Sequence, residues 1–544
     1  MSASNQPLKQ AAATSHMAHA AGQVQIDINP ATGEEIASYP CTDLTQLPAM
    51  IARAREAQKI WAQKSFKERQ RYILKMQDYI AENAEELATA VSRSNGKTVF
   101  DALVTEVLPS AVSCQWYSAN TARILKPEQR GWGSWLMVNK RYEIRYMPVG
   151  VVGIISPWNY PLSIPFGEIV MGLMAGNAVL LKVAEATVSV TELIEKIVGA
   201  AGLPEGLFQT VYGRGSQISS AFLAAGVDKL FFTGSVRAGK LIMAEAAQTL
   251  TPLSLELGGN DPMIVLEDAD LERAVNGALW AGFQNAGQSC GGVERIYVHA
   301  RIYDEFLRQI KIKTERLTHG PSTGPADGVS IGSITTEGQL RTVQQHLEEA
   351  LEKGARIWAQ SKPAGDQSKG YFHPATVLVD TTDDMLCVRE ETFGPLVAVM
   401  KFDTVDEVIR RANDSDYALT ASVWSCSHKT AMQVADRLEA GVVTINDHLY
   451  THGLADMPWG AWKNSGMGRT HGPEGLLEMV NRKAVNWDVL SVKRSFWWYP
   501  HDKADYDALV HIIKTKTLLG LSSKFSKVPM VAGAYTKKVF SKWL

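Results

Sequence analysis

Short apolar runs alternate with longer amphipathic stretches between residues 149 and 256. The runs cover residues 151–156, 178–182, 208–211, 229–232 and 253–257. The stretches between them are long enough for crossover helices, so consecutive runs are expected to form parallel strands. The pattern predicts a doubly wound parallel sheet, which binds ligands at the carboxyl ends of its strands.

Helical and strand periodicities flank this region. Residues 49–113 place apolar side chains three and four positions apart, which predicts helices with Trp61, Tyr72, Leu74 and Ile80 in the core. Residues 132–145 alternate apolar and polar side chains, with Leu136, Val138, Tyr142 and Ile144 on one face. That alternation predicts a pair of strands.

Composition narrows the class of protein. The chain has 544 residues, enough for two or three domains. A net charge of −2 gives no reason to expect nucleic acid as a partner. The five cysteines (41, 114, 290, 387 and 426) are odd in number and lack a CxxC pair. This favours a reducing, cytoplasmic location over a disulfide framework, and predicts no metal site. Residues 1–23 lack an apolar signal core and are predicted to be a flexible arm.

Cys290 stands among small and amide residues, in the stretch 283–295. Small neighbours would let a substrate carbon approach the sulfur, although an isolated cysteine is more often a buried structural residue. The helix-compatible run 278–283 is expected to aim backbone N–H groups at the thiol and favour the thiolate. Glu256 lies in an apolar run, where burial would raise its pKa towards that of a general base.

Polar residues follow several of the predicted strands. Asn159 comes after the first run, where a turn-stabilising role is the alternative to presenting its amide to a ligand. Lys182 and Glu185 follow the second run, and could equally be a solvated ion pair. The segment 231–239 has strand, glycine turn and helix in the order of a phosphate site, without the GxGxxG spacing.

Together these segments resemble the NAD(P)-dependent aldehyde dehydrogenase superfamily over residues 29–485. The cysteine stretch 283–295 and the glutamate stretch 255–260 carry the resemblance. It implies an α/β fold with a doubly wound parallel cofactor domain, an α/β catalytic domain and a small β oligomerisation hairpin. The implied boundaries are 24–128 and 149–257 for the NAD-binding domain, 258–472 for the catalytic domain, and 129–148 and 473–492 for the oligomerisation segments.

The resemblance also implies roles for individual residues. Cys290 would be the nucleophile, Glu256 the base that activates water, and Asn159 an oxyanion donor together with the Cys290 backbone N–H. The cofactor residues would be Ser156, Pro157, Trp158, Lys182, Glu185, Gly234, Ser235, Gly239, Leu257, Glu391 and Phe393. For Phe393, a β-turn with a core aromatic is the structural alternative. Glu185 favours NAD, with NADP the alternative, because a carboxylate accepts from a ribose 2′-hydroxyl and repels a 2′-phosphate.

The sequence departs from the family pattern at a few positions. Thr470 follows Arg469, where many hydrolytic members place a second glutamate in a proton relay. Tryptophans at 116, 158, 459 and 462 could build an apolar tunnel. We therefore expect oxidation of a medium-to-long-chain or aromatic aldehyde to the acid by a homodimer or homotetramer. The alternatives are a semialdehyde dehydrogenase, a catalytically silent scaffold and a cysteine hydrolase.

Residues 493–544 lie beyond the resemblance. They contain ten Lys and Arg residues against three Asp, a local net charge of +7, and the aromatic cluster 496–499. Leu509, Val510, Ile512, Ile513, Leu518, Leu519 and Leu521 have helix-like spacing. A basic amphipathic extension suits peripheral contact with an anionic membrane. The alternative is a helix that packs on its own body or on a sister subunit.

Overall fold

The structure, a computed structural model, describes residues 23–130, 137, 139–495 and 497–515. The predicted N-terminal arm, except for residue 23, lies outside them, as do Leu136 and Val138 of the predicted strand pair. The chain divides into two compact units. One contains residues 1–122 and 148–479, and the other contains residues 123–147 and 480–544.

A six-stranded sheet in the larger unit confirms the predicted parallel arrangement. Its order is β21-β9-β8-β5-β6-β7, and only β21 is antiparallel to its neighbour. The strands are β5 (Val151–Ile155), β6 (Ala178–Lys182), β7 (Phe208–Thr210), β8 (Lys229–Thr233), β9 (Leu253–Glu256) and β21 (Gly466–Met467). Their apolar runs lack alternation because β5, β6 and β8 are buried throughout.

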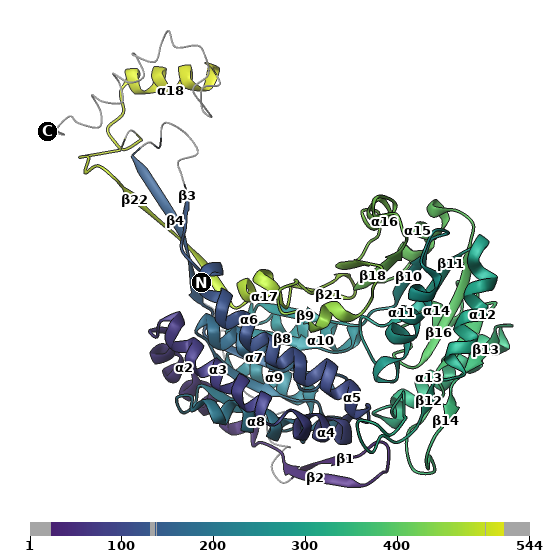
Figure 1. Cartoon of the computed structure of the whole chain (residues 1–544). Helices are drawn as coiled ribbons and strands as arrows, with labels where there is room; N and C mark the ends of the chain where they lie inside the picture. The colour runs from purple at the N-terminus through teal and green to yellow at the C-terminus, as the bar shows by residue number, and fades with distance from the viewer. Residues whose placement is uncertain (1–22, 131–136, 138, 496, 516–544) are drawn as a thin grey trace, which may run out of the picture. The chain divides into compact units, whose positions relative to one another are not determined.

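Helices connect these strands and cover the sheet (Figure 1). The connecting helices are α7 (Ser163–Ala175), α8 (Val190–Ala201), α9 (Gly215–Ala225) and α10 (Val236–Ala246). The N-terminal part of the chain supplies α2 (Leu47–Ala62), α3 (Phe66–Glu82), α4 (Ala84–Asn95), α5 (Val99–Ala102) and α6 (Leu108–Ile124), with a π-helical turn at Leu103–Val107. Trp61 and Ile80 are buried as predicted. Leu74 is not, because Ile73 and Met76 form the buried stripe of α3 and Leu74 lies beside it.

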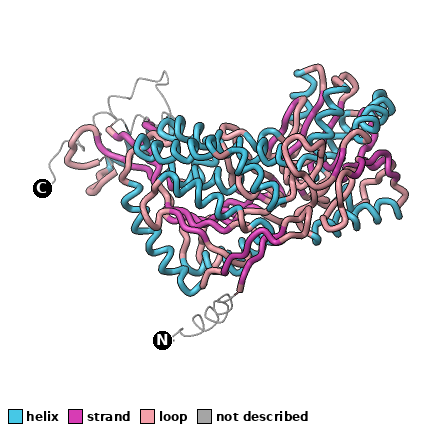
Figure 2. Tube along the Cα trace, turned by 60° about the horizontal axis from the view of Figure 1, so that its bottom comes forward, coloured by secondary structure: helices cyan, strands magenta, loops and turns pink. Residues whose placement is uncertain are grey.

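A seven-stranded sheet forms the second layered part of the larger unit. Its order is β13-β15-β16-β11-β10-β18-β19, and only β13 is antiparallel. The strands are β10 (Asp261–Val265), β11 (Val293–His299), β13 (Arg356–Gln360), β15 (Thr376–Val379), β16 (Leu396–Phe402), β18 (Thr420–Trp424) and β19 (Val442–Ile445). Its helices are α11 (Leu271–Phe283), α12 (Tyr303–Thr314), α13 (Glu337–Glu352), α14 (Leu386–Arg389), α15 (Val405–Asn413) and α16 (His428–Ala435), and Figure 2 shows the helices and strands of the chain by colour.

The two sheets present opposite strand ends to the candidate site. Asn159 and Glu256 lie at the carboxyl ends of β5 and β9 in the six-stranded sheet. Cys290 and Phe393 come just before the amino ends of β11 and β16 in the seven-stranded sheet. The topology therefore places residues from distant parts of the sequence around one cavity.

The smaller unit contains a three-stranded sheet and a helix. The sheet has the order β22-β4-β3, formed by β22 (Val480–Asp488), β4 (Lys140–Pro148) and β3 (Glu128–Arg130). Strand β4 confirms the described half of the predicted strand pair. Helix α18 (Lys503–Thr515) confirms the first part of the predicted amphipathic helix, and its continuation through Leu521 lies outside the described residues. In the described part of the chain, no helix is long and apolar enough to cross a membrane.

Candidate active site

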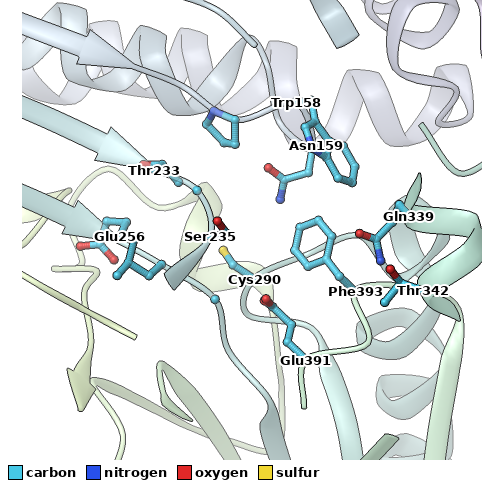
Figure 3. A pocket seen from close by; sticks show the side chains of 14 residues that line it. Trp158, Asn159, Thr233, Ser235, Glu256, Cys290, Gln339, Thr342, Glu391 and Phe393 are labelled. Atoms are coloured by element: carbon cyan, nitrogen blue, oxygen red, sulfur yellow. The ribbon is translucent and has the colours of Figure 1, made fainter. Parts of the chain in front are cut away.

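A cavity of about 700 Å³ brings the predicted catalytic residues together. Figure 3 shows Cys290 between Glu256 on one side and Phe393 and Glu391 on the other, with the Asn159 amide directed into the same space. The cavity is lined by Pro157, Trp158, Asn159, Thr233, Gly234, Ser235, Glu256, Leu257, Gly258, Cys290, Gln339, Thr342, Glu391 and Phe393. This set includes the three predicted catalytic residues and seven of the predicted cofactor residues.

A left-handed turn presents Cys290 to the cavity. After α11 ends, Asn285, Ala286 and Gly287 all have positive φ, at 53°, 53° and 70°. A Cβ on Gly287 would lie 2.1 Å from the Gly394 carbonyl oxygen, so only glycine allows this approach of the two loops. Holding Asn285 and Ala286 in this left-handed conformation costs about 1–3 kcal/mol each, and such strain is typical of functional sites.

The expectation that the preceding helix favours the thiolate is wrong. Cys290 follows the carboxyl end of α11, and a helix exposes carbonyl groups rather than N–H groups at that end. Burial raises the pKa of the Cys290 thiol, and the nearby carboxyls of Glu391, Asp261 and Glu256 raise it further. The resting group is therefore a thiol, and a base must take its proton before it attacks a carbonyl.

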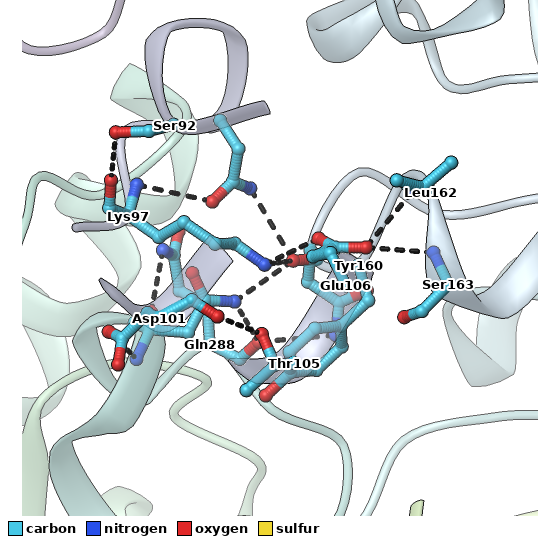
Figure 4. A network of polar contacts seen from close by, with 12 residues as sticks. Ser92, Lys97, Asp101, Thr105, Glu106, Tyr160, Leu162, Ser163 and Gln288 are labelled. Carbon is cyan, nitrogen blue, oxygen red and sulfur yellow. Dashed lines mark hydrogen bonds and ion pairs between the residues drawn. The ribbon is translucent and has the colours of Figure 1, made fainter. Parts of the chain in front are cut away.

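A buried ion pair fixes the backbone beside Asn159 (Figure 4). Lys97 Nζ lies 2.6 Å from a Glu106 carboxylate oxygen and donates to the Asn159 carbonyl oxygen at 2.8 Å. The other Glu106 oxygen accepts from the backbone N–H groups of Leu162 (3.1 Å) and Ser163 (2.8 Å). This leaves the Asn159 side-chain amide to donate towards the cysteine turn, at 3.1 Å from the Gln288 carbonyl oxygen.

Glu256 ends β9 as a buried acid without a partner. Its side chain is 5% exposed, and neither carboxylate oxygen has a hydrogen-bond partner among the described residues. Burial raises the pKa of this carboxyl well above its usual value, Arg469 opposes that rise, and Glu168 and Glu478 add to it. A carboxyl of raised pKa beside a cysteine is suited to general-base chemistry.

Glu391 and Phe393 share a loop that the carboxyl of Glu294 holds in place. Buried Glu294 accepts from the backbone N–H groups of Thr392 (2.9 Å) and Phe393 (2.7 Å), where Phe393 has a φ of 50°. Glu391 accepts from the Gly259 N–H at 2.9 Å, and burial raises its pKa to about 7. Phe393 packs edge-on against Trp158 at 5.3 Å between ring centroids. Phe393 therefore lines the cavity, and the alternative of a core phenylalanine fails.

The Gly234 turn leads into the amino end of α10. Ser235 caps this helix, accepting from the Ala238 N–H at 3.3 Å, and both Gly234 and Ser235 line the cavity. Free N–H groups at a helix amino end bind phosphate oxygens. Gly239 does not line the cavity: a Cβ there would lie 2.7 Å from Leu257 Cδ2, so its role is close packing of α10 on Leu257.

Lys182 and Glu185 form one pair at the end of β6. Lys182 Nζ lies 2.6 Å from Glu185 Oε2, and Glu185 Oε1 accepts from the Gly215 N–H at 2.8 Å. Lys182 is 3% exposed, so the alternative of a solvated ion pair fails for the lysine. Ser156 donates to the Lys182 carbonyl oxygen at 3.4 Å and does not line the cavity. The two charged groups are held together at the carboxyl end of β6.

Tyr160 and His452 form part of the wall of a separate apolar cavity of about 820 Å³. It is lined by Val104, Thr105, Leu108, Pro109, Val112, Tyr160, Trp280, Gln284, Leu449, Tyr450, His452, Gly453 and Leu454. Of the four tryptophans predicted to build a tunnel, none lines this cavity, and Trp280 of α11 does so instead. Trp116 packs on Tyr117, and Trp462 is exposed at the short strand β20 (Trp462–Lys463).

Several residues of the site escaped the sequence analysis. Lys97, Glu106 and Glu294 position the Asn159 and Phe393 loops, and each is buried. Their signal in the sequence was weak, because Lys97 and Glu106 stand in a helical region and Glu294 stands near the end of the cysteine stretch, away from the thiol. Thr233 and Gly258, which lie inside the stretches 231–239 and 255–260, complete the cavity wall with Gln339 and Thr342, which have no distinctive pattern.

A parallel sheet whose strand ends meet a cysteine, a glutamate and a phosphate-type turn defines a dinucleotide-binding oxidoreductase. The chain belongs to the aldehyde dehydrogenase family, whose model matches residues 17–485. It uses a nicotinamide cofactor, as this family does.

Three relatives illustrate the range of similar proteins. A putative succinate-semialdehyde dehydrogenase [NADP(+)] 2 of Mycobacterium ulcerans is 37% identical, over 84% of this chain and 86% of that protein. A 4,4′-diapolycopene aldehyde oxidase of Methylomonas is 34% identical, over 88% of this chain and 89% of that protein. The NAD⁺ complex of an aldehyde dehydrogenase from Bacillus cereus has a TM-score of 0.81 and 35% identity, over 86% of this chain and 94% of that one.

Proposed function

We propose that this protein oxidises an apolar aldehyde, of medium-to-long chain or aromatic, to the carboxylic acid with NAD⁺. The observation that carries the proposal is the apolar cavity next to Tyr160 and His452, whose lining contains no lysine, arginine, aspartate or glutamate. A semialdehyde has a terminal carboxylate, which needs a cationic partner when it is buried. For this reason we do not transfer the semialdehyde substrate in the name of the mycobacterial relative to this chain.

We propose catalytic steps that use the residues gathered around the cavity. The Cys290 thiol gives its proton to Glu256 and attacks the aldehyde carbon, while the Asn159 amide and the Cys290 backbone N–H stabilise the oxyanion. The nicotinamide would supply the hydride acceptor, held by Glu391 and Phe393. Once Glu256 has released the proton taken from Cys290, it deprotonates the water that hydrolyses the thioester, and the acid and the Cys290 thiolate are released.

We assign the cofactor residues by their position. The turn at Gly234 and Ser235 would bind the pyrophosphate, and Lys182 and Glu185 the adenosine ribose. Pro157, Trp158 and Leu257 would form the walls of the cofactor cleft. In this arrangement the six-stranded part is the NAD-binding domain, the seven-stranded part from residue 258 to 472 is the catalytic domain, and segments 129–148 and 473–492 mediate a homodimer or homotetramer. The protein would act in the cytoplasm.

A panel of aldehydes tests the function. Decanal, hexanal, benzaldehyde, acetaldehyde and succinic semialdehyde are offered with NAD⁺ or NADP⁺, and the absorbance of the reduced cofactor is followed. Each buried methylene stabilises by about 0.8 kcal/mol, so kcat/KM for decanal should exceed that for acetaldehyde at least about tenfold. Cys290→Ala should abolish turnover. A preference for succinic semialdehyde would overturn the substrate class, and no turnover with any aldehyde would favour a silent scaffold.

A further inference from the structure

A second cavity lies behind Cys290, on the side of the six-stranded sheet. It is lined in part by Glu168, Glu256, Cys290, His452, Thr470 and His471. We call it the rear chamber. It brings two carboxyls and two imidazoles to the catalytic cysteine, and Thr470 occupies its wall without supplying a titratable group.

Glu168 is the second carboxyl of the rear chamber and comes from the first half of α7, a wholly buried helix. Its side chain is 3% exposed, and no hydrogen bond to it is found among the described residues. Burial raises its pKa to about 8, and its charge in turn raises the pKa of Glu256. Two buried carboxyls that repel each other in this way do not both ionise at neutral pH.

The two imidazoles continue the polar path. His471 has a φ of 58° and a ψ of 166°, a backbone region almost restricted to glycine, so the fold holds this side chain in place at a cost. Its Nδ1 lies 3.3 Å from Thr470 Oγ1. His452 packs at 5.4 Å between ring centroids from His471 and also lines the apolar cavity. Burial lowers the pKa of both rings, to about 4 for His471 and about 3 for His452, so both are neutral and hold an added proton only briefly.

We propose that Glu168 and His471 form the proton relay that serves Glu256 during thioester hydrolysis, in place of a carboxyl at position 470. The inference rests on the proposed function. Glu256 breaks an O–H bond of water, whose oxygen attacks the thioester carbon, and the C–S bond then breaks with sulfur leaving as thiolate. The proton on Glu256 passes to Glu168 in its carboxylate form. The neutral His471 imidazole then takes this proton on one ring nitrogen and releases a proton from the other, so it keeps no charge. His452 connects this ring to the apolar cavity.

Several parts of the chain supply the titratable and charged groups around Glu256. They are Glu168 on α7, Arg469 in the loop after β21, Glu478 on α17 (Gly472–Glu478), and the titratable groups Cys290, His452 and His471 that share the chamber. Of the two carboxylates that raise the pKa of Glu256, only Glu168 lies in the rear chamber with it. Replacing Glu168 by a neutral isostere removes repulsion, so the pKa of Glu256 should fall.

The test separates hydride transfer from hydrolysis. Glu168→Gln is mixed rapidly with NAD⁺ and decanal, and the reduced cofactor formed in the first turnover is compared with the steady-state rate. We expect a full burst of one NADH per active site, followed by a steady state about 10-fold to 100-fold slower than wild type. The acidic limb of its pH profile should move to lower pH. Met171→Leu, which changes an apolar residue lining the same chamber one turn along α7, is the matched control and should match wild type.

A wild-type steady-state rate and pH profile in Glu168→Gln would overturn the relay. If that variant fails to fold, His471→Gln decides, because the relay predicts a full burst and slowed hydrolysis there too. Loss of the burst in both variants, with Met171→Leu intact, would place the two residues in the attack of the thiol and would also overturn it. Failure of the proposed function looks different, since wild type would then form no NADH with any aldehyde.

Discussion

At the residue scale, the chemistry depends on how burial changes ordinary side chains. Cys290 lies among three carboxyls that oppose its ionisation, and Glu256 is buried without a hydrogen-bond partner among the described residues. Cys290 alone is a poor nucleophile at neutral pH because it rests as a thiol, and burial favours the neutral form of Glu256. Only the carboxylate form of Glu256 can take the proton of Cys290 and so produce the thiolate.

The raised pKa of the Cys290 thiol predicts how it reacts with iodoacetamide. When the pH is below the pKa of a thiol, its thiolate fraction rises about tenfold for each pH unit. Alkylation of Cys290 should therefore accelerate by about tenfold per pH unit between pH 6 and 9. Mass spectrometry of the Cys290 peptide measures the rate, with exposed Cys426 as the internal reference. A rate independent of pH above 6 would show that Cys290 rests as a thiolate.

Glu185 predicts the choice of cofactor. Its carboxylate is held by Lys182 and the Gly215 N–H, in a position to accept from a ribose 2′-hydroxyl. Wild type should prefer NAD⁺, and Glu185→Gln should lower the ratio of kcat/KM for NAD⁺ over NADP⁺ about tenfold or more, equal to about 1.4 kcal/mol. Glu192→Gln, at an exposed carboxylate of α8, should leave the ratio unchanged. A wild-type preference for NADP⁺ would show that Glu185 does not select the cofactor.

At the element scale, loops from distant helices and strands are fixed by buried charges. The loop after β5 is held by Lys97 and Glu106, which belong to the turn after α4 and to the π-helical turn before α6. The loop before β16 is held by Glu294 at the start of β11. Because these carboxyls accept backbone N–H groups, each sets the position of a loop rather than that of a single side chain.

Breaking the Lys97–Glu106 pair should therefore affect both stability and activity. Lys97→Met leaves a buried carboxylate without its cation, which costs about 3–5 kcal/mol of unfolding free energy. We expect a lower urea midpoint and a reduced kcat, because the Asn159 carbonyl loses one of its donors and keeps that from Asn285. Lys59→Met, which removes the exposed Lys59–Glu56 pair on α2, is the control and should change neither. Equal midpoints for the two variants would contradict a structural role for the buried pair.

At the scale of the whole molecule, the C-terminal unit adds a basic, aromatic extension to the family body. Trp498 and Tyr499 are 52% and 80% exposed, and the family model ends before them, at residue 485. Aromatic side chains beside excess lysine are suited to the interface of an anionic membrane. We propose that this extension gives the protein peripheral membrane contact.

Vesicle sedimentation tests the role of the extension. The full-length chain should sediment with phosphatidylserine vesicles more than with phosphatidylcholine vesicles, and salt should weaken the binding because it screens the charges. A double variant with Trp498→Ser and Tyr499→Ser, and a chain that ends at residue 492, should each bind less. Equal sedimentation of all three proteins would contradict membrane contact and favour packing on a sister subunit, which the oligomeric state of the shortened chain would reveal.

The sequence by itself determined the parallel sheet of the six-stranded part and which residues are candidates for the site. Buried parallel strands are short continuous apolar runs separated by helices, and this local pattern survives in the sequence without any tertiary information. Cys290, Glu256 and Asn159 were predicted because the stretches that contain them resemble the aldehyde dehydrogenase motifs. All three line one cavity.

Only the tertiary structure decided the protonation of the site and the composition of its second cavity. The helix before Cys290 was expected to favour the thiolate, but its carboxyl end lies nearest, and the carboxyls that oppose ionisation come from positions 256, 261 and 391. Glu168, His452 and His471 are far apart in sequence and meet in the rear chamber because α7 and the late loops pack together. Burial and long-range charge depend on which segments meet, and no local pattern records that.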